Sequence, residues 1–386
     1  MNDRRAFTLI SIIRNIITIY FDTFFAIYFF NLTNYEILPL AKYYLIVYFV
    51  ISLCFWFLRK FTNLKYKVFY YRIGISFLAL YLAFIMLLKE KIVDYIYLVA
   101  FVKGLSEGFY YYPRNILNST KISNAERGHY DGILNAINQV SSIVIPLLLG
   151  ILLTYFNYVE IGKAVFILVI VIFILSYYVK DDGNTKDKVK TIEFLKKIWK
   201  NQKIKNALII QFLKGFTISS GVLTAAMTIY KILYFESNLY IGILNSFLGI
   251  LTCIFCIIYA KKSNKSFKKI NIITFILFAI SISALVLKPN NYIFIIYLVI
   301  YATGITLITL RSDNITVNAS NHYLIVFHKA EYHMILELFL GLSRVIGYIA
   351  LLIVGLINHE LFLRFILLFS IIPLGLLTYF VNKKEH

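Results

Sequence analysis

Long apolar stretches separated by short polar segments dominate the sequence. A helix needs about 20 mostly apolar residues to cross a bilayer, and division of the chain at charge clusters and turn residues leaves twelve such stretches. Segments of about ten residues with alternating polarity, typical of outer-membrane barrels, are lacking. The pattern predicts an all-α membrane protein whose twelve spanning helices lie near 7–30, 40–58, 68–88, 92–113, 132–157, 161–179, 204–230, 238–260, 270–287, 291–310, 332–357 and 361–381.

The composition excludes a water-soluble enzyme. Hydrophobic residues make up 60% of the chain and charged residues only 15%, whereas soluble domains carry about 25% charged residues. The three cysteines lie in apolar runs and are expected to be core residues. His322, His328 and His333 match no metal-ligand spacing, and the chain has neither a phosphate-binding glycine loop nor a Ser/His/Asp set. We therefore expect no enzymatic activity, no cofactor and no metal site.

The longest polar segment, Lys180 to Lys205, divides the twelve stretches into six and six. We predict an amino-terminal six-helix bundle over residues 1–180, a cytoplasmic linker over 181–203 and a carboxy-terminal six-helix bundle over 204–386. Within the linker, Ile192, Leu195 and Trp199 follow helical spacing among lysines. This pattern is typical of an amphipathic helix that lies in the membrane interface.

The basic residues indicate the orientation in the membrane. The net charge is +20, and most of the 39 Lys and Arg residues fall in segments that an even number of spans places on one side, together with both termini. The positive-inside rule then predicts cytoplasmic termini in the cell membrane. The basic residues meet anionic membrane lipid there, so the charge does not indicate nucleic acid. Enrichment in residues with AT-rich codons favours a bacterial source.

The two halves also resemble each other. Pro113-Arg-Asn-Ile-Leu-Asn-Ser-Thr near the end of the fourth stretch has a counterpart in Leu310-Arg-Ser-Asp-Asn-Ile-Thr-Val near the end of the tenth, and each is followed by a polar loop and a long span. Arg114 and Arg311 occupy equivalent places. With twelve spans in two sets of six, cytoplasmic termini and a basic central loop, the whole chain resembles the major facilitator superfamily of secondary transporters.

The resemblance implies two pseudo-symmetric six-helix bundles that alternate access to a midplane site for a small-molecule substrate, commonly with coupled protons, in a protein expected to act as a monomer. Local signatures are only partly kept. The loop after the second span keeps its basic residues but lacks the family's Gly and Asp, and Lys103-Gly is displaced from an Arg motif of the fourth span. The fifth span retains Pro146 and Gly150 of the drug-antiporter motif, which favours export.

Ionisable residues within spans are the strongest functional indicators, because a charge in lipid costs several kcal/mol unless it faces protein or water. Lys103, Glu107 and Arg114 follow i, i+4 and i+11 and share one helix face. Each charge either lines a passage or forms a structural ion pair, and the sequence leaves both readings open. The candidates for substrate binding or proton coupling are Asp22, Glu107, Glu337, Arg344, Lys214, Lys103 and Arg14.

Polar residues on two other spans form stripes that either line a cavity or support helix packing. The cavity-lining candidates are Asn135, Asn138, Thr217 and Thr224, and the gate candidates are Arg114, Asp131 and Arg311.

Three functions are consistent with these features. The leading hypothesis is a proton-coupled secondary transporter that exports an amphipathic organic compound, because 34 Phe and 31 Tyr suit an apolar cavity. The second is uptake or flipping of an anionic solute or lipid, because bases outnumber acids within the spans. The third is a sensor, immunity or scaffold protein that has the transporter fold without transport.

Overall fold

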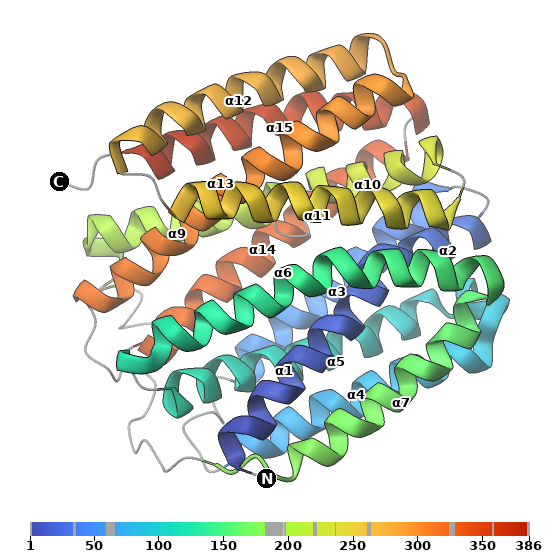
Figure 1. Cartoon of the computed structure of the whole chain (residues 1–386), viewed down its shortest axis with the longest axis vertical. Coiled ribbons are helices and arrows are strands. Elements are labelled where there is room, and N and C mark those ends of the chain that lie inside the picture. The colour runs from blue at the N-terminus through green and yellow to red at the C-terminus, as the bar shows by residue number, and fades with distance from the viewer. Residues whose placement is uncertain are drawn as a thin grey trace. The chain divides into compact units, whose positions relative to one another are not determined.

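The computed structural model describes residues 2–33, 36–58, 66–122, 124–181, 196, 198–218, 222–235, 237–260, 264–323, 329–356 and 359–383, and these ranges are helical apart from short turns (Figure 1). In chain order the first elements are α1 (Asp3–Tyr20), the π-helical turn η1 (Phe21–Phe25), α2 (Ala26–Leu32), α3 (Ile37–Leu58), α4 (Lys67–Leu88), the 3₁₀ turn η2 (Lys89–Val93), α5 (Ile96–Lys121), α6 (Asn124–Tyr155) and α7 (Tyr158–Ser176). They are followed by α9 (Gln202–Thr217), α10 (Val222–Tyr234), α11 (Asn238–Ala260), α12 (Asn264–Leu287), α13 (Asn291–Tyr323), α14 (Lys329–Gly355) and α15 (His359–Asn382).

These elements confirm the predicted all-α fold with twelve helical spans. The elements α1, η1 and α2 follow one another without a break and form the first span, and α9 and α10 together occupy the seventh. Among the described residues, ten helices are long and apolar enough to cross a membrane. The other two spans are α5, whose hydropathy is lowered by Lys103, Glu107 and its tyrosines, and the α9–α10 pair, whose members have 16 and 13 residues.

Several helix ends differ from the predicted boundaries for identifiable reasons. The span predicted at 291–310 continues as α13 to Tyr323, because no Gly or Pro follows Gly304 within it and polar residues alone do not end a helix. Within the span predicted at 204–230, α9 ends at Thr217 and α10 begins at Val222, and residues 219–221 lie outside the described residues. The predicted interfacial helix falls largely on residues 182–195 and 197, which lie outside the described residues.

The chain divides into two compact units. Unit 1 comprises Met1–Val189 and Ser237–Ser246, and unit 2 comprises Lys190–Glu236 and Phe247–His386. In unit 1, α5 packs against α3 and α4, α7 packs against α1 and α4, and α6 packs against α1. In unit 2, α13 packs against α12, α15 packs against α9 and α12, and α14 packs against α9.

Several neighbour pairs therefore recur in both units. Chain order relates α1, α4, α5, α6 and α7 to α9, α12, α13, α14 and α15, and five packed pairs of the first set have counterparts in the second. A pairing scheme of this kind is what an internal repeat of six spans produces. The sequence similarity around Arg114 and Arg311 thus marks equivalent helices, α5 and α13.

Glycines hold α5 close to its neighbours in unit 1. A Cβ atom placed on Gly74 of α4 would lie 2.5 Å from the backbone nitrogen of Tyr110 and 2.7 Å from the carbonyl carbon of Phe109 on α5. On the opposite side, Gly104 and Gly108 of α5 face Val50 and Cys54 of α3. Small residues allow membrane helices to approach closely, so these contacts fix the position of the charged face of α5.

We expect Gly74→Ala to destabilise unit 1, because the added methyl group meets backbone atoms that cannot rotate away. The expected loss is about 1–3 kcal/mol, measured as a lower melting temperature of the purified protein in detergent. Gly162→Ala is the matched control, since its Cβ would meet only the Tyr20 hydroxyl at 3.2 Å. Equal melting temperatures for the two variants would contradict the close contact between α4 and α5.

Candidate functional site

A buried triad of charged side chains connects α1 with α5 in unit 1. The Nη2 atom of Arg14 donates to Oε1 of Glu107 at 2.7 Å, and Nζ of Lys103 donates to the same oxygen at 2.5 Å. All three residues are buried, with exposed fractions of 2% for Arg14, 9% for Lys103 and 7% for Glu107. Taken alone, the triad carries one more positive than negative charge, and Asp22 in the first span is a further acid that acts electrostatically on Lys103.

Aromatic rings and hydroxyl groups surround the triad. The guanidinium carbon of Arg14 lies 5.1 Å from the ring centroid of Tyr110, and the ammonium nitrogen of Lys103 lies 4.4 Å from that of Phe21 and 5.2 Å from that of Tyr81. Nη1 of Arg14 also donates to Oγ1 of Thr18 at 3.3 Å. Cation–π contacts gain strength when they are desolvated, so these rings help to stabilise the positive charge.

A cavity of about 130 Å³ adjoins the triad within unit 1. Its lining includes two arginines, Arg14 and Arg114, and none of the described residues that line it is acidic. The lining residues are Ser11, Arg14, Asn15 and Thr18 of α1, Tyr110, Tyr111 and Arg114 of α5, and Leu134 and Asn138 of α6. A polar recess of this kind, bordered by spanning helices, has the chemistry to receive water or a polar ligand.

Two features of the backbone lie near this cavity, one in α5 and one in the first span. Pro113 lies within α5, one residue before Arg114, and has no N–H group. The carbonyl of Phe109 therefore lacks the hydrogen bond that residue i+4 of a helix normally donates. In the first span, regular α1 gives way to the π-helical turn Phe21–Phe25, which contains Asp22. Such turns occur frequently at functional sites. Asp22 is exposed and acts electrostatically on Lys103.

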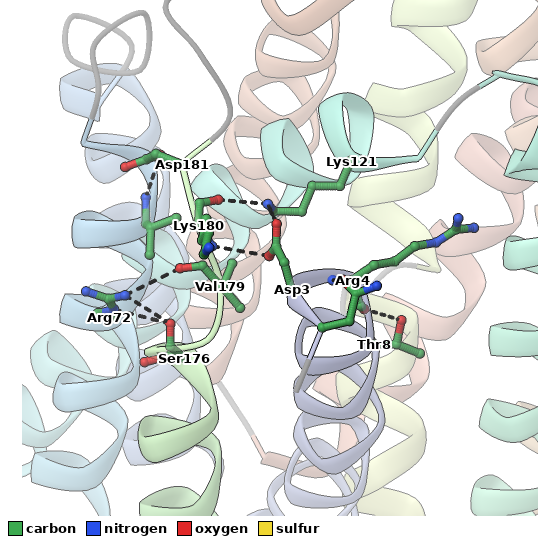
Figure 2. A network of polar contacts seen from close by, with 11 residues as sticks. Asp3, Arg4, Thr8, Arg72, Lys121, Ser176, Val179, Lys180 and Asp181 are labelled. Atoms are coloured by element: carbon green, nitrogen blue, oxygen red, sulfur yellow. Dashed lines mark hydrogen bonds and ion pairs between the residues drawn. The ribbon is translucent and has the colours of Figure 1, made fainter.

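A second polar network fastens the end of unit 1 at which α1 begins and α5 and α7 end (Figure 2). Nζ of Lys121 binds Oδ2 of Asp3 at 2.6 Å and the carbonyl of Lys180 at 2.7 Å, and the Lys180 backbone N–H donates to Asp3 at 3.2 Å. Arg72 donates to the carbonyls of Ser176 and Val179. Arg72 thereby adds a side-chain donor to carbonyls at the end of α7, of which that of Ser176 also accepts from the backbone N–H of Val179.

Unit 2 contains an ion pair between the equivalent helices. Nζ of Lys214 on α9 lies 2.5 Å from Oδ1 of Asp313 on α13, just as Arg14 on α1 binds Glu107 on α5. The Lys214 side chain is 9% exposed, whereas that of Asp313 is 52% exposed. The acid in unit 2 is thus far more accessible than Glu107.

The structure brings only part of the predicted set together. Arg14, Lys103 and Glu107 form the triad, and Arg14, Arg114 and Asn138 line the cavity. Asn135 is exposed and does not line the cavity, and the buried hydroxyl of Thr217 donates to the carbonyl of Leu213 in its own helix. Glu337 and Arg344 on α14 and Arg311 on α13 are half-buried. The side chains of Asp131, Thr224, His322, His328 and His333 lie outside the described part.

Asp313 is a residue that the sequence reasoning missed. The sequence predicts that the tenth span ends at residue 310, which places Asp313 in the following loop, whereas Asp313 lies within α13. The repeat gave a usable signal, because Asp313 follows Arg311 in the segment that matches Arg114. Ser11, Asn15 and Thr18 were also missed, although they lie within one turn of Arg14 on α1.

Twelve spans in two repeated units, with a polar cavity among spanning helices, define a membrane transporter rather than an enzyme. The family model of the Major Facilitator Superfamily matches residues 6–347. The chain belongs to this superfamily.

Solved structures of similar fold include the nucleoside transporter NupG, with a TM-score of 0.68, 12% identity and 100% of both chains covered. A bacterial homologue of the iron transporter ferroportin in an outward-facing state has a TM-score of 0.68 and 12% identity, with 99% of this chain and 98% of that chain covered. The human organic anion transporter MFSD10 has a TM-score of 0.66 and 10% identity, with 99% and 100% covered. At these identities the likeness shows the fold alone. No curated protein sequence matches the chain.

We expect Glu107→Gln to destabilise the protein more than Lys103→Gln. The first change leaves two buried cations without their carboxylate and costs about 3–5 kcal/mol. The second keeps the pair of Arg14 and Glu107 and removes the excess charge, so its cost is smaller. Melting temperatures in detergent measure both effects. Glu160→Gln serves as the control, because Glu160 caps α7 at an exposed position that glutamine also fills. Equal losses of melting temperature for Glu107→Gln and Lys103→Gln would show that Glu107 is not the shared partner of Arg14 and Lys103.

Proposed function

We propose that the chain is a secondary active transporter that moves a small organic anion by alternating access. The observation that carries this proposal is the unit 1 cavity, which two arginines line and to which no described acidic residue contributes. We further propose that the protein lies in the cell membrane with both termini in the cytoplasm, as the distribution of its basic residues favours.

The charge balance around the cavity supports an anionic substrate. Glu107 is shared between Arg14 and Lys103, and the half-buried Arg114 adds a third cation from the same helix as Lys103. Coulomb attraction is much stronger in a low-dielectric interior than in water. A negatively charged group that enters the cavity therefore completes the neutralisation that Glu107 only begins.

The lining also has the hydrogen-bond donors that an anion needs. Guanidinium groups present several N–H donors in one plane and bind carboxylate or phosphate oxygens in pairs. Asn15, Asn138 and Thr18 add neutral amide and hydroxyl donors. A volume of about 130 Å³ suits a carboxylate or phosphate group, so the remainder of a larger solute has to extend beyond it.

Export of an amphipathic compound has less support from this site. The Pro146 and Gly150 remnant favours export, but the cavity lining contains one purely apolar residue, Leu134, against two arginines, two asparagines and two tyrosines. A lining of this kind favours a polar ligand over an apolar one. We therefore prefer the anionic substrate to the amphipathic one.

We expect proteoliposomes that contain the protein to take up organic carboxylates or organophosphates in preference to neutral and cationic solutes of similar size. Arg114→Gln should lower the apparent affinity about tenfold or more, because a charge-assisted hydrogen bond contributes about 1.5–3 kcal/mol. Arg114→Lys should recover part of this affinity, since lysine keeps the charge but loses the planar donors. Uptake assays across a panel of labelled solutes measure these effects.

Two asparagines on α6 provide a matched control for the same assay. Asn138→Ala removes a donor from the cavity lining and should weaken anion uptake, whereas Asn135→Ala changes an exposed side chain one turn earlier and should not. Transport of neutral or cationic solutes with no uptake of anions would exclude the proposed substrate class. Absence of transport and of binding across the panel would favour a sensor, immunity or scaffold role.

For proton coupling we propose Asp22 rather than Glu107. Glu107 accepts hydrogen bonds from two cations, which hold it ionised. Asp22 is exposed within the first span, in the π-helical turn, and acts electrostatically on Lys103. A carboxylate at such a position has to border water, where it can gain and lose a proton.

We expect Asp22→Asn to abolish uptake that a pH gradient drives but to spare exchange of labelled for unlabelled anion at equal pH. The amide keeps the size of the side chain and removes its proton site. Uptake with an imposed pH gradient and equilibrium exchange, measured on the same proteoliposomes, separate the two activities. If Asp22→Asn leaves gradient-driven uptake unchanged, another residue couples transport to protons, and Glu337 is the next acid to test.

A further inference from the structure

In unit 2, α12 and α15 pack against each other (Figure 1). Residues of both helices line a second hollow. Its volume is about 430 Å³, within the range of ligand pockets. We call it the α12–α15 groove, and its lining residues are Lys268, Ile272, Phe275, Gly375, Thr378, Tyr379, Asn382 and Lys383.

The absence of a side chain at Gly375 keeps the groove open. A Cβ atom at this position would lie 2.9 Å from Cζ of Phe275 and 3.3 Å from its Cε2 atom. The amide of the buried Asn271 donates to Oδ1 of Asn382 at 3.1 Å and joins the two helices beside the groove. The two helices are therefore in close contact at Asn271 and Asn382 and leave an unfilled space beside that contact.

The groove has a polar end and an apolar remainder. Lys268 lies in the second turn of α12 and Lys383 directly follows α15, so both lie at the ends of spanning helices. Both are exposed, and within the described part of the chain neither forms an ion pair. Ile272, Phe275 and Tyr379 form the apolar part, and Ile272 and Tyr379 are themselves exposed at the protein surface.

This combination fits a ligand with an anionic head and a hydrocarbon tail. We propose that the α12–α15 groove binds an anionic glycerophospholipid, with the phosphate headgroup at Lys268 and Lys383 and an acyl chain along Ile272, Phe275 and Tyr379. Basic pockets between spanning helices attract anionic headgroups, and the bilayer supplies the ligand directly. The distribution of Lys and Arg places this end of the two helices at the proposed cytoplasmic leaflet.

The lipid site is tested by binding to the full-length protein in detergent, read by native mass spectrometry during titration with phosphatidylglycerol or phosphatidylcholine of identical chains. The native protein should bind phosphatidylglycerol more tightly. The double variant Lys268→Gln, Lys383→Gln should lose this preference by about tenfold or more, since each basic residue at the interface contributes about one kcal/mol. Lys269→Gln, at the neighbouring exposed lysine that does not line the groove, should leave it unchanged.

The apolar part has its own variants. Gly375→Leu fills the groove without altering charge and should weaken lipid binding, and Ile272→Trp fills it from the exposed side if the first variant does not fold. Equal binding of the two lipids by the native protein overturns the proposal. So does an effect of Lys269→Gln as large as that of the double variant, because it would show diffuse attraction. Glycerol phosphate competing as well as the lipid would identify a free phosphate site and also overturn it.

Discussion

The high cost of a charge removed from water organises unit 1. Arg14, Lys103 and Glu107 are buried within a bundle that a membrane surrounds, where an unpaired ion costs several kcal/mol. Sharing one carboxylate between two cations reduces this cost without cancelling it. The remaining positive charge is placed against aromatic rings and beside a polar cavity. The same arrangement that fastens α1 to α5 therefore leaves a place in which an anion is stabilised.

Both units contain an ion pair between equivalent helices, and the acids of the two pairs differ in exposure. In each unit a base on the first helix pairs with an acid on the fourth, as Arg14 with Glu107 and Lys214 with Asp313. Glu107 is enclosed by two cations, whereas the Asp313 side chain is 52% exposed and contacts one. Screening by solvent weakens an exposed pair, so the pair in unit 2 separates at lower cost.

The sequence predicted which residues belong to this site better than it predicted which of them contact one another. Charges within spans identified Arg14, Lys103 and Glu107, because hydropathy alone makes them exceptional, and Arg114 was identified as a gate candidate that shares a helix face with Lys103 and Glu107. That Glu107 joins Arg14 depends on the mutual rotation and depth of α1 and α5, which no single-helix pattern records. Gly74 and Gly104 hold α5 close to α4 and α3 and so fix the position of α5 itself. Asn135 and Asn138 illustrate the limit. They are three residues apart and were grouped together, yet only Asn138 lines the cavity.

Irregular backbone accompanies the buried charge of the first helix in unit 1. The π-helical turn at Phe21–Phe25 follows Arg14 by two turns. Such a turn disturbs the regular hydrogen bonds of the helix, and irregular backbone at membrane depth is tolerated only where protein or water satisfies its polar groups. A buried cation needs the same surroundings, so the first span places both features where they share one polar environment.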